Sequence, residues 1–146
     1  MDEGAAPGLR PASVRAWLRM IRVVQRVNRA AAEQLAAEGL TLPQFDVLTH
    51  IGAAEGLTQQ QLAGRLLVTE GNITQLLVRL EQRGLLKRTP SGHSKRLSLT
   101  PVGRALFART VHRHEALIAE KLDALSDAEA RELHRLLRRV DRSLAE

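Results

Sequence analysis

Residues 58–100 read TQQQLAGRLLVTEGNITQLLVRLEQRGLLKRTPSGHSKRLSLT, and this stretch decides the fold. Helical patterns begin at Thr58 and at Thr69, where a threonine hydroxyl can accept a hydrogen bond from the free N–H groups of a first helical turn. Two short strands are expected at residues 85–89 and 96–100, on either side of a turn that contains proline and glycine. A pair of helices followed by a basic hairpin is typical of proteins that bind duplex DNA.

The 146-residue chain carries a formal net charge of +6, and its pI is about 11.1. An acidic partner is therefore favoured, and nucleic acid and an anionic membrane surface are the usual two. No apolar run approaches the roughly 20 residues of a membrane-spanning helix, and the acidic N-terminus lacks the apolar block of a secretory signal. We expect no membrane partner and, by default, a cytoplasmic location.

The residue types that are absent or rare narrow the function further. The chain has no cysteine, which excludes disulfides and thiol-based sensing. Its aromatic residues are only Trp17, Phe45 and Phe107. Proteins that bind single-stranded nucleic acid usually stack bases on aromatic side chains, so double-stranded DNA is the favoured partner.

The periodicity of apolar residues and the positions of glycine and proline divide the chain into four segments. Residues 1–12 are expected to be a flexible lead, and residues 13–39 a long helix with one apolar stripe. Residues 40–100 hold a shorter helix, the helix pair and the hairpin, and residues 101–146 hold two further helices. Helix starts are marked by capping boxes, in which Ser or Thr is followed three residues later by Gln or Glu: Thr41–Gln44, Thr58–Gln61 and Ser126–Glu129.

The helix expected over residues 70–83 has an apolar and a polar side. The inward side consists of aliphatic residues at three-and-four spacing, namely Ile73, Leu76, Leu77 and Leu80. On the outward side, Asn and Gln can pair with adenine and Arg with guanine, while threonine hydroxyls and the free N–H groups of the first turn suit phosphate oxygens. Glu70 is discordant, and either interacts with the helix dipole or accepts from a cytosine amino group. The candidate DNA contacts of the helix pair are Thr58, Gln59, Thr69, Gly71, Asn72, Thr74, Gln75 and Arg79.

The hairpin adds four candidate DNA contacts, Arg88, His93, Lys95 and Arg96. A cationic loop beside a groove-reading helix can reach phosphates or the adjacent minor groove. The alternative is a solvated turn with ordinary surface charge. The position of the hairpin directly after a helix pair favours the DNA-binding interpretation.

Residues 68–85, VTEGNITQLLVRLEQRGL, resemble the recognition helix of the MarR family of winged helix-turn-helix regulators. Three further segments resemble the family in the same order: LTLPQFDVL at residues 40–48, LTQQQLA at 57–63 and SLTPVGR at 98–104. The resemblance covers about residues 40–108 well. It implies a mainly α fold with a small β-hairpin wing, in which N- and C-terminal dimerisation helices flank a winged helix-turn-helix domain.

The resemblance also implies a homodimer whose two winged domains contact a pseudo-palindromic operator. The apolar stripes of residues 13–39 and 101–146 fit this arrangement, although packing within one chain accounts for part of them. We expect a sequence-specific transcriptional regulator, in the simplest case a repressor that a ligand releases from DNA. The alternative is a winged-helix module that binds a protein and has no preferred DNA sequence.

The hairpin departs from the family pattern at its tip. Many relatives have a longer wing with an Asp-Arg or Asp-Lys-Arg motif, whereas this chain has Ser91-Gly-His-Ser94 before Lys95 and Arg96. The acidic residue that would orient the wing arginine is therefore absent. We expect Arg96 as the first choice for the wing contact and Lys95 as the second.

Members of the family often respond to small anionic aromatic molecules bound between the dimer helices and the DNA-binding lobe. Candidate contacts for such a ligand are Trp17, Arg22, His50 and Arg109, although Trp17 is better suited to core or interface packing. No metal site is expected, because His112 and His114 point about 200° apart on a helix. The chain lacks a phosphate-binding glycine loop, a zinc-protease motif and a nucleophile elbow, so we expect neither catalysis nor a cofactor.

Overall fold

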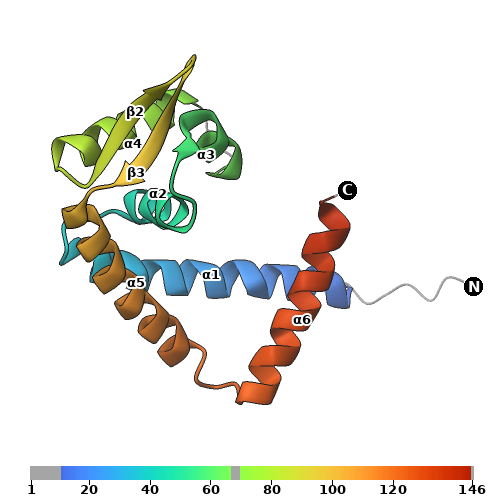
Figure 1. The fold of residues 1–146 in the computed structure, drawn as a ribbon. Coiled ribbons are helices and arrows are strands. Elements are labelled where there is room, and N and C mark those ends of the chain that lie inside the picture. The colour runs from blue at the N-terminus through green and yellow to red at the C-terminus, as the bar shows by residue number, and fades with distance from the viewer. Residues whose placement is uncertain (1–10, 67–69, 146) are drawn as a thin grey trace, which may run out of the picture.

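The computed structural model describes residues 11–66 and 70–145. Helices α2, α3 and α4 gather with a small sheet in one lobe, and α1, α5 and α6 extend from it (Figure 1). The mainly α fold with a small β wing is therefore confirmed. In chain order the elements are α1 (Ala12–Ala36), α2 (Leu42–Ala53), β1 (Leu57–Thr58), α3 (Gln59–Leu66), α4 (Glu70–Gln82), β2 (Leu86–Ser91), β3 (Ser94–Leu99), α5 (Pro101–Lys121) and α6 (Asp127–Leu144).

One apolar core holds the lobe together, and α2, α3, α4 and the sheet all bury aliphatic side chains in it. Burying one leucine side chain contributes about 1.5–3 kcal/mol. Helix α4 supplies several of the fully buried residues, so packing fixes its orientation within the lobe. The fully buried residues include Leu48, Ile51, Leu62, Ile73, Leu77, Leu80 and Leu97.

All three predicted capping boxes are present, at Thr41–Gln44, Thr58–Gln61 and Ser126–Glu129. In the first, the Gln44 N–H donates to Thr41 Oγ1 at 3.3 Å and the Thr41 N–H donates to Gln44 Oε1 at 3.0 Å. Each box satisfies two N–H groups that would otherwise lack a partner at a helix start. These local bonds explain why α2, α3 and α6 begin where the sequence predicts.

The wing strands are longer than predicted. Strands β2 and β3 stay paired up to Ser91 and Ser94, which leaves a two-residue turn of Gly92 and His93. Gly92 has a φ of +63°, as tight hairpin turns of this length require. The turn lies within the predicted residues 90–94 but is shorter than predicted. Pro90 continues β2 because β2 is an edge strand in the sheet order β1-β3-β2, where a proline is tolerated.

A third strand, β1, was not predicted. It pairs antiparallel with β3, so that Leu57 lies opposite Leu97 and Thr58 opposite Arg96. Two residues are too short for an alternating pattern to be recognised in the sequence. Strand β1 joins the start of α3 directly to the wing.

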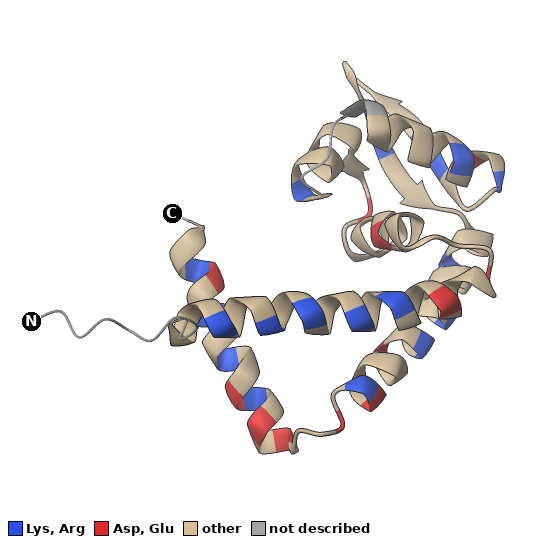
Figure 2. Ribbon diagram, turned by 180° about the vertical axis from the view of Figure 1, so that it is seen from behind, with Lys and Arg blue, Asp and Glu red and all other residues tan. Residues whose placement is uncertain are grey.

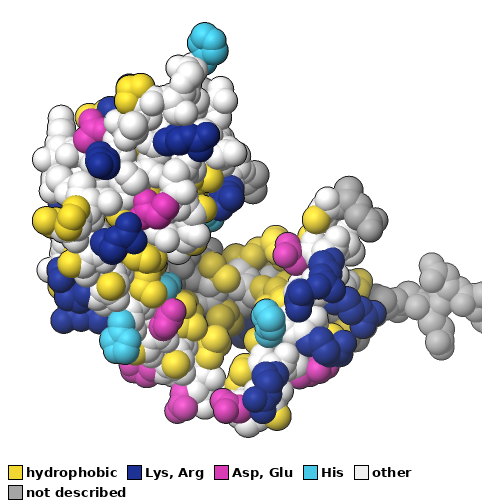
Figure 3. Space-filling model, in the orientation of Figure 1, with side chains coloured by type: hydrophobic (Ala, Val, Ile, Leu, Met, Phe, Trp, Pro, Cys, Tyr) yellow, Lys and Arg dark blue, Asp and Glu magenta, His cyan; other side chains and the backbone are white. Residues whose placement is uncertain are grey.

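The helices outside the lobe differ in how closely they pack against the rest of the chain. Helix α5 packs against α1 and α2, and its Gly103 lies so close to the lobe that a Cβ there would overlap the carbonyl oxygen of Leu85. Helix α6 buries none of its residues. On the face shown in Figure 3, apolar side chains line the hollow that α1, α5 and α6 enclose. None of the described helices has an apolar stretch long enough to cross a bilayer.

Candidate nucleic-acid interface

Helix α4 has an exposed polar face opposite its buried one. The predicted inward residues lie in or against the core: Ile73, Leu76, Leu77 and Leu80. Asn72, Gln75 and Arg79 are exposed, and Gln75 and Arg79 line one shallow depression with Thr74. Amide and guanidinium groups on one exposed helix face can pair with base edges in a major groove.

A hydrogen bond within the chain links α3 and α4 where they cross. Gln59 Nε2 donates to Thr74 Oγ1 at 2.7 Å, which links the two helices. Thr58 caps α3, since its hydroxyl accepts from the N–H of Gln61 at 3.1 Å. Of the other predicted contacts, Gly71 lies in the first turn of α4, whereas Thr69 lies outside the described residues.

The wing places its two candidate cations on opposite faces of the sheet. Lys95 and His93 line a common pocket with Gln59 and Thr74 of the helix pair. Side chains alternate along a strand, so Arg96 faces the other way. Of Lys95 and Arg96, it is thus Lys95 that shares a surface with the helix pair, and Arg88 of β2 lines the same pocket.

Arg96 is held against the outer face of the sheet. Its Nε donates to Ser91 Oγ at 3.1 Å, and its Nη1 donates to the carbonyl oxygen of Gly56 at 2.9 Å. Ser91 and Gly56 therefore orient this arginine in the absence of an acidic partner. The geometry favours Lys95 over Arg96 as the wing contact, and the identity of that contact stays a prediction.

Arg88 is engaged inside the lobe. Its Nε and Nη2 donate to the two carboxylate oxygens of Glu81 at 3.0 and 3.2 Å, and its side chain is only 15% exposed. These hydrogen bonds lower the pKa of Glu81. The bidentate pair ties α4 to β2. Arg88 therefore has a structural role in the lobe, and its predicted contact with DNA stays a prediction.

The candidate ligand contacts do not converge within one protomer. Trp17 is 59% exposed, so it does not pack in the core of its own chain. Arg22 lines a pocket on α1 with other arginines, whereas Arg109 binds Glu38 near the far end of that helix. Arg22 lies 14 residues, or about 21 Å, before the end of α1 at Ala36, so the two arginines lie at different places along this helix. His50 lies half-buried on α2.

Basic residues also follow one side of α1 (Figure 2). Part of the positive charge therefore lies outside the lobe, and net charge alone does not locate the DNA interface. The exposed arginines recur every three or four residues: Arg15, Arg19, Arg22, Arg26 and Arg29. Among the described residues no group of three histidine or acidic side chains could hold a metal ion.

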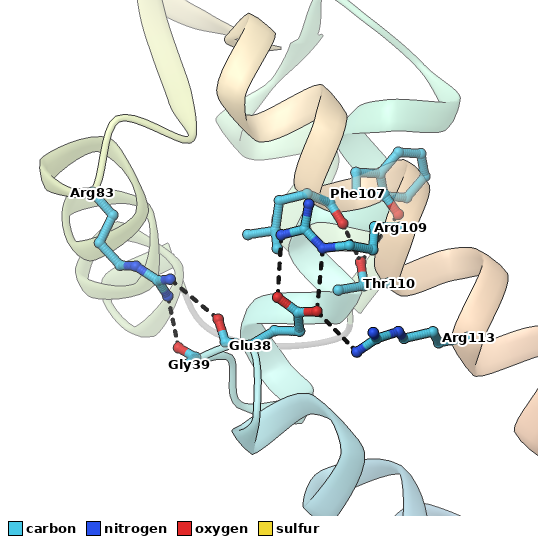
Figure 4. A network of polar contacts seen from close by, with 8 residues as sticks. Glu38, Gly39, Arg83, Phe107, Arg109, Thr110 and Arg113 are labelled. Carbon is cyan, nitrogen blue, oxygen red and sulfur yellow. Dashed lines mark hydrogen bonds and ion pairs between the residues drawn. The ribbon is translucent and has the colours of Figure 1, made fainter.

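One arginine cluster was not predicted from the sequence, which indicated only Arg109 of its members, as a candidate ligand contact. Arg83 follows α4 and contacts the turn after α1, where Glu38 binds Arg109 and Arg113 of α5 (Figure 4). Arg109 and Arg113 are four residues apart, which places them on one side of a helix. This spacing was the only signal in the sequence, and it is equally typical of a solvated face.

Comparisons with known proteins agree with this geometry. Residues 38–97 match the sequence profile of the MarR family. An HTH-type transcriptional regulator of Bacillus cereus is 36% identical over 125 residues, which is 85% of each chain. An HTH-type transcriptional repressor of Mycobacterium tuberculosis is 34% identical over 124 residues, 83% of this chain and 89% of the relative.

A solved structure extends the agreement to the fold. Mutant MarR from E. coli, complexed with operator DNA, has a TM-score of 0.76 and 29% identity to this chain, and the match covers 88% of this chain and 95% of that one. The family pattern, the relatives and the winged fold with its polar helix face all agree. The chain belongs to the MarR family of winged helix-turn-helix, DNA-binding transcription regulators.

Proposed function

We propose that this protein is a homodimeric repressor that binds a pseudo-palindromic operator and leaves it when a small ligand binds. The exposed polar face of α4 carries this proposal, because it combines amides and a guanidinium beside the wing cation Lys95. Such a face suits base edges, whereas backbone N–H groups and lysine suit phosphates. No catalytic role enters the proposal.

In the proposed complex α4 enters the major groove. Asn72 and Gln75 read adenine, and Arg79 reads guanine. Lys95 and His93 approach the adjacent backbone, because they share a pocket with the start of α3. The hydrogen bond between Gln59 and Thr74 helps to preorganise the crossing of α3 and α4, which reduces the conformational entropy lost on binding.

Unpartnered apolar side chains support the homodimer. Trp17 and Val24 of α1 are more than half exposed, and so is Val140 of α6. Several large exposed apolar side chains on one helix are typical of an interface, and a two-fold dimer would bury the same surface on both copies. A dimer also places two copies of α4 one helical turn of DNA apart, about 34–36 Å.

The proposal includes repression of transcription and release from the operator by a ligand. The Mycobacterium tuberculosis relative is named a repressor. A ligand lowers operator affinity if it binds a DNA-incompetent arrangement of the two lobes more tightly than the competent one. Because Arg22 and Arg109 are far apart in one protomer, a small anionic aromatic ligand would contact residues of both protomers. Its candidate contacts are Trp17, Arg22, His50 and Arg109.

A gel shift with duplex DNA from upstream of the protein's own gene tests the DNA-binding part. We expect the Gln75→Ala variant to lose about 1–3 kcal/mol of discrimination between this duplex and a scrambled one. The Lys95→Ala variant should weaken binding to both duplexes and lower the salt slope by about one unit. Lys87→Ala is the matched control, because Lys87 is exposed on the outer face of β2.

Two results would count against the proposal. Equal losses in the Lys95→Ala and Lys87→Ala variants would reject the docking geometry. If the wild-type protein did not prefer the upstream duplex to random duplexes, the alternative of a protein-binding winged helix would be favoured. Light scattering at micromolar concentration separately tests the dimer, and a monomer mass would contradict it.

A further inference from the structure

The end of the recognition helix is attached to the turn after α1 (Figure 4). Arg83 directly follows α4, and it donates to the carbonyl oxygens of Gly39 at 2.7 Å and Glu38 at 3.4 Å. These carbonyl groups lie just after the C-terminus of α1, next to the negative end of its dipole. A guanidinium is therefore well matched to this position.

The shape of the turn keeps these acceptors in place. Gly39 has a φ of +70°, and the Leu40 N–H donates to the carbonyl oxygen of Leu35 at 3.0 Å. This left-handed glycine closes the end of α1 in the way many helices terminate. A Cβ at Gly39 would also touch the Arg83 guanidinium, at 3.4 Å from Nη2. The backbone that receives Arg83 thus has little freedom.

The side chain of Glu38 continues the contact to α5. Its carboxylate accepts from Arg109 at 3.2 and 3.1 Å and from Arg113 at 3.1 Å. The two arginines lie one helical turn apart, so both reach the same carboxylate. The hydrogen bonds from Arg109 lower the pKa of Glu38. The Glu38 side chain is only 17% exposed.

We propose that Glu38, Arg83, Arg109 and Arg113 form a positioning link that sets the angle of α4 relative to α5. In a two-fold dimer the link acts once in each protomer, so a change in this angle alters the separation of the two recognition helices. The link thereby selects the half-site spacing that the dimer accepts. This inference rests on the proposed function as a DNA-binding dimer, and none of the four residues needs to touch a base.

The test uses the full-length chain and a duplex that the wild-type protein selects from a random pool. Fluorescence anisotropy measures affinity for this duplex, for versions with one to four base pairs inserted between the half-sites, and for an isolated half-site. We expect the Arg83→Gln and Glu38→Gln variants to lose about tenfold in affinity for the best-spaced duplex. Their preference among spacings should broaden, and their affinity for the half-site should stay unchanged.

Glu132→Gln is the matched control. Glu132 binds Arg135 at 2.8 and 2.7 Å, but both residues lie within α6, so this pair links no two elements. The control should keep the wild-type spacing profile. Arg83→Lys retains a cation for the two carbonyl groups and should restore part of the preference.

The outcomes separate positioning from simple destabilisation. A wild-type spacing profile in both Arg83→Gln and Glu38→Gln would overturn the link. Equal losses on the half-site and the full duplex would also overturn it, because a general folding defect weakens both. If the wild-type protein selected no duplex from the pool, the proposed function itself would fail, which is distinguishable from a failure of the link alone.

Discussion

The DNA-binding lobe and the long helices around it differ in how they cover apolar residues. The lobe buries Leu48, Leu77 and Leu97 completely with side chains of its own chain. Helix α6 buries nothing, and Leu136 and Leu137 on it remain partly exposed. A helix with a strong apolar stripe and no partner is stable only when another surface covers it. The lobe is therefore complete within one protomer, whereas the exposed apolar stripes of α1 and α6 are the surface that the proposed dimer would cover.

The polar contacts show the same division. In the lobe, Arg88 and Gln59 are bound by neighbouring elements. On α6, the ion pair of Glu132 and Arg135 lies within one helix. The turn at Glu38 is the place where arginines from both regions meet. It is therefore the natural point at which the geometry of one region constrains the other.

The largest expected effect comes from shortening a buried leucine of the lobe. Leu77→Ala should lower the free energy of unfolding by about 2–5 kcal/mol, because it removes apolar contacts and leaves a cavity. The loss should be the same at every protein concentration. Leu137→Ala on α6 should instead weaken the dimer, so its effect on the urea midpoint should depend on protein concentration.

Urea unfolding of both variants at two concentrations a hundredfold apart checks this contrast. Leu137→Ala could instead lower the free energy of unfolding as much as Leu77→Ala does, and equally at both protein concentrations, which would contradict the proposed difference between the two regions. Such a result would mean that α6 packs against its own chain in solution.

The next effect concerns the junction between the two regions. Gly103→Ala should destabilise the protein by about 1–3 kcal/mol, because its Cβ would overlap the Leu85 carbonyl and push α5 from the lobe. Gly64 in α3 has open space around it. Gly64→Ala should therefore stabilise the protein by about 0.5–1 kcal/mol, since alanine favours helix. Thermal unfolding of both variants checks the prediction, and a loss of stability in Gly64→Ala would contradict it.

Most of the lobe could be predicted from the sequence because its signals are local. Thr41 and Thr58 start helices through bonds to residues three positions away, and the spacing of Ile73 and Leu77 identified the buried side of α4. Gln75 is exposed as predicted. Such patterns need no knowledge of the tertiary fold.

The contacts of the arginines could not be predicted in this way. Arg96 binds the carbonyl oxygen of Gly56, 40 residues away in sequence, and Arg83 binds Gly39, 44 residues away. Both acceptors are backbone groups, which every residue type carries, so no sequence pattern marks them. The length of the wing strands likewise depended on which strand lies at the sheet edge.

The smallest expected effect is on the pH dependence of stability. Arg88 lowers the pKa of Glu81 in the lobe, and Arg135 lowers that of Glu132 on α6, both from an ordinary value of 4.5. A carboxyl whose pKa is lower in the folded state contributes stability above its unfolded pKa and loses it as pH falls through the folded value. Stability should therefore decline below about pH 4.5.

Substituting each glutamate in turn separates the two regions. Glu81→Gln should make the acid decline shallower, because the bidentate pair with Arg88 is half-buried. Glu132→Gln should change it less, because its pair is exposed and screened by solvent and salt. Urea unfolding between pH 3 and pH 7, at low and high salt, measures both slopes. The free energy of unfolding could instead fall as steeply with decreasing pH in Glu81→Gln as in the wild type. That result would mean that the Arg88 pair forms equally well in the unfolded chain, because stability depends on pH only where the pKa of Glu81 differs between the folded and unfolded states.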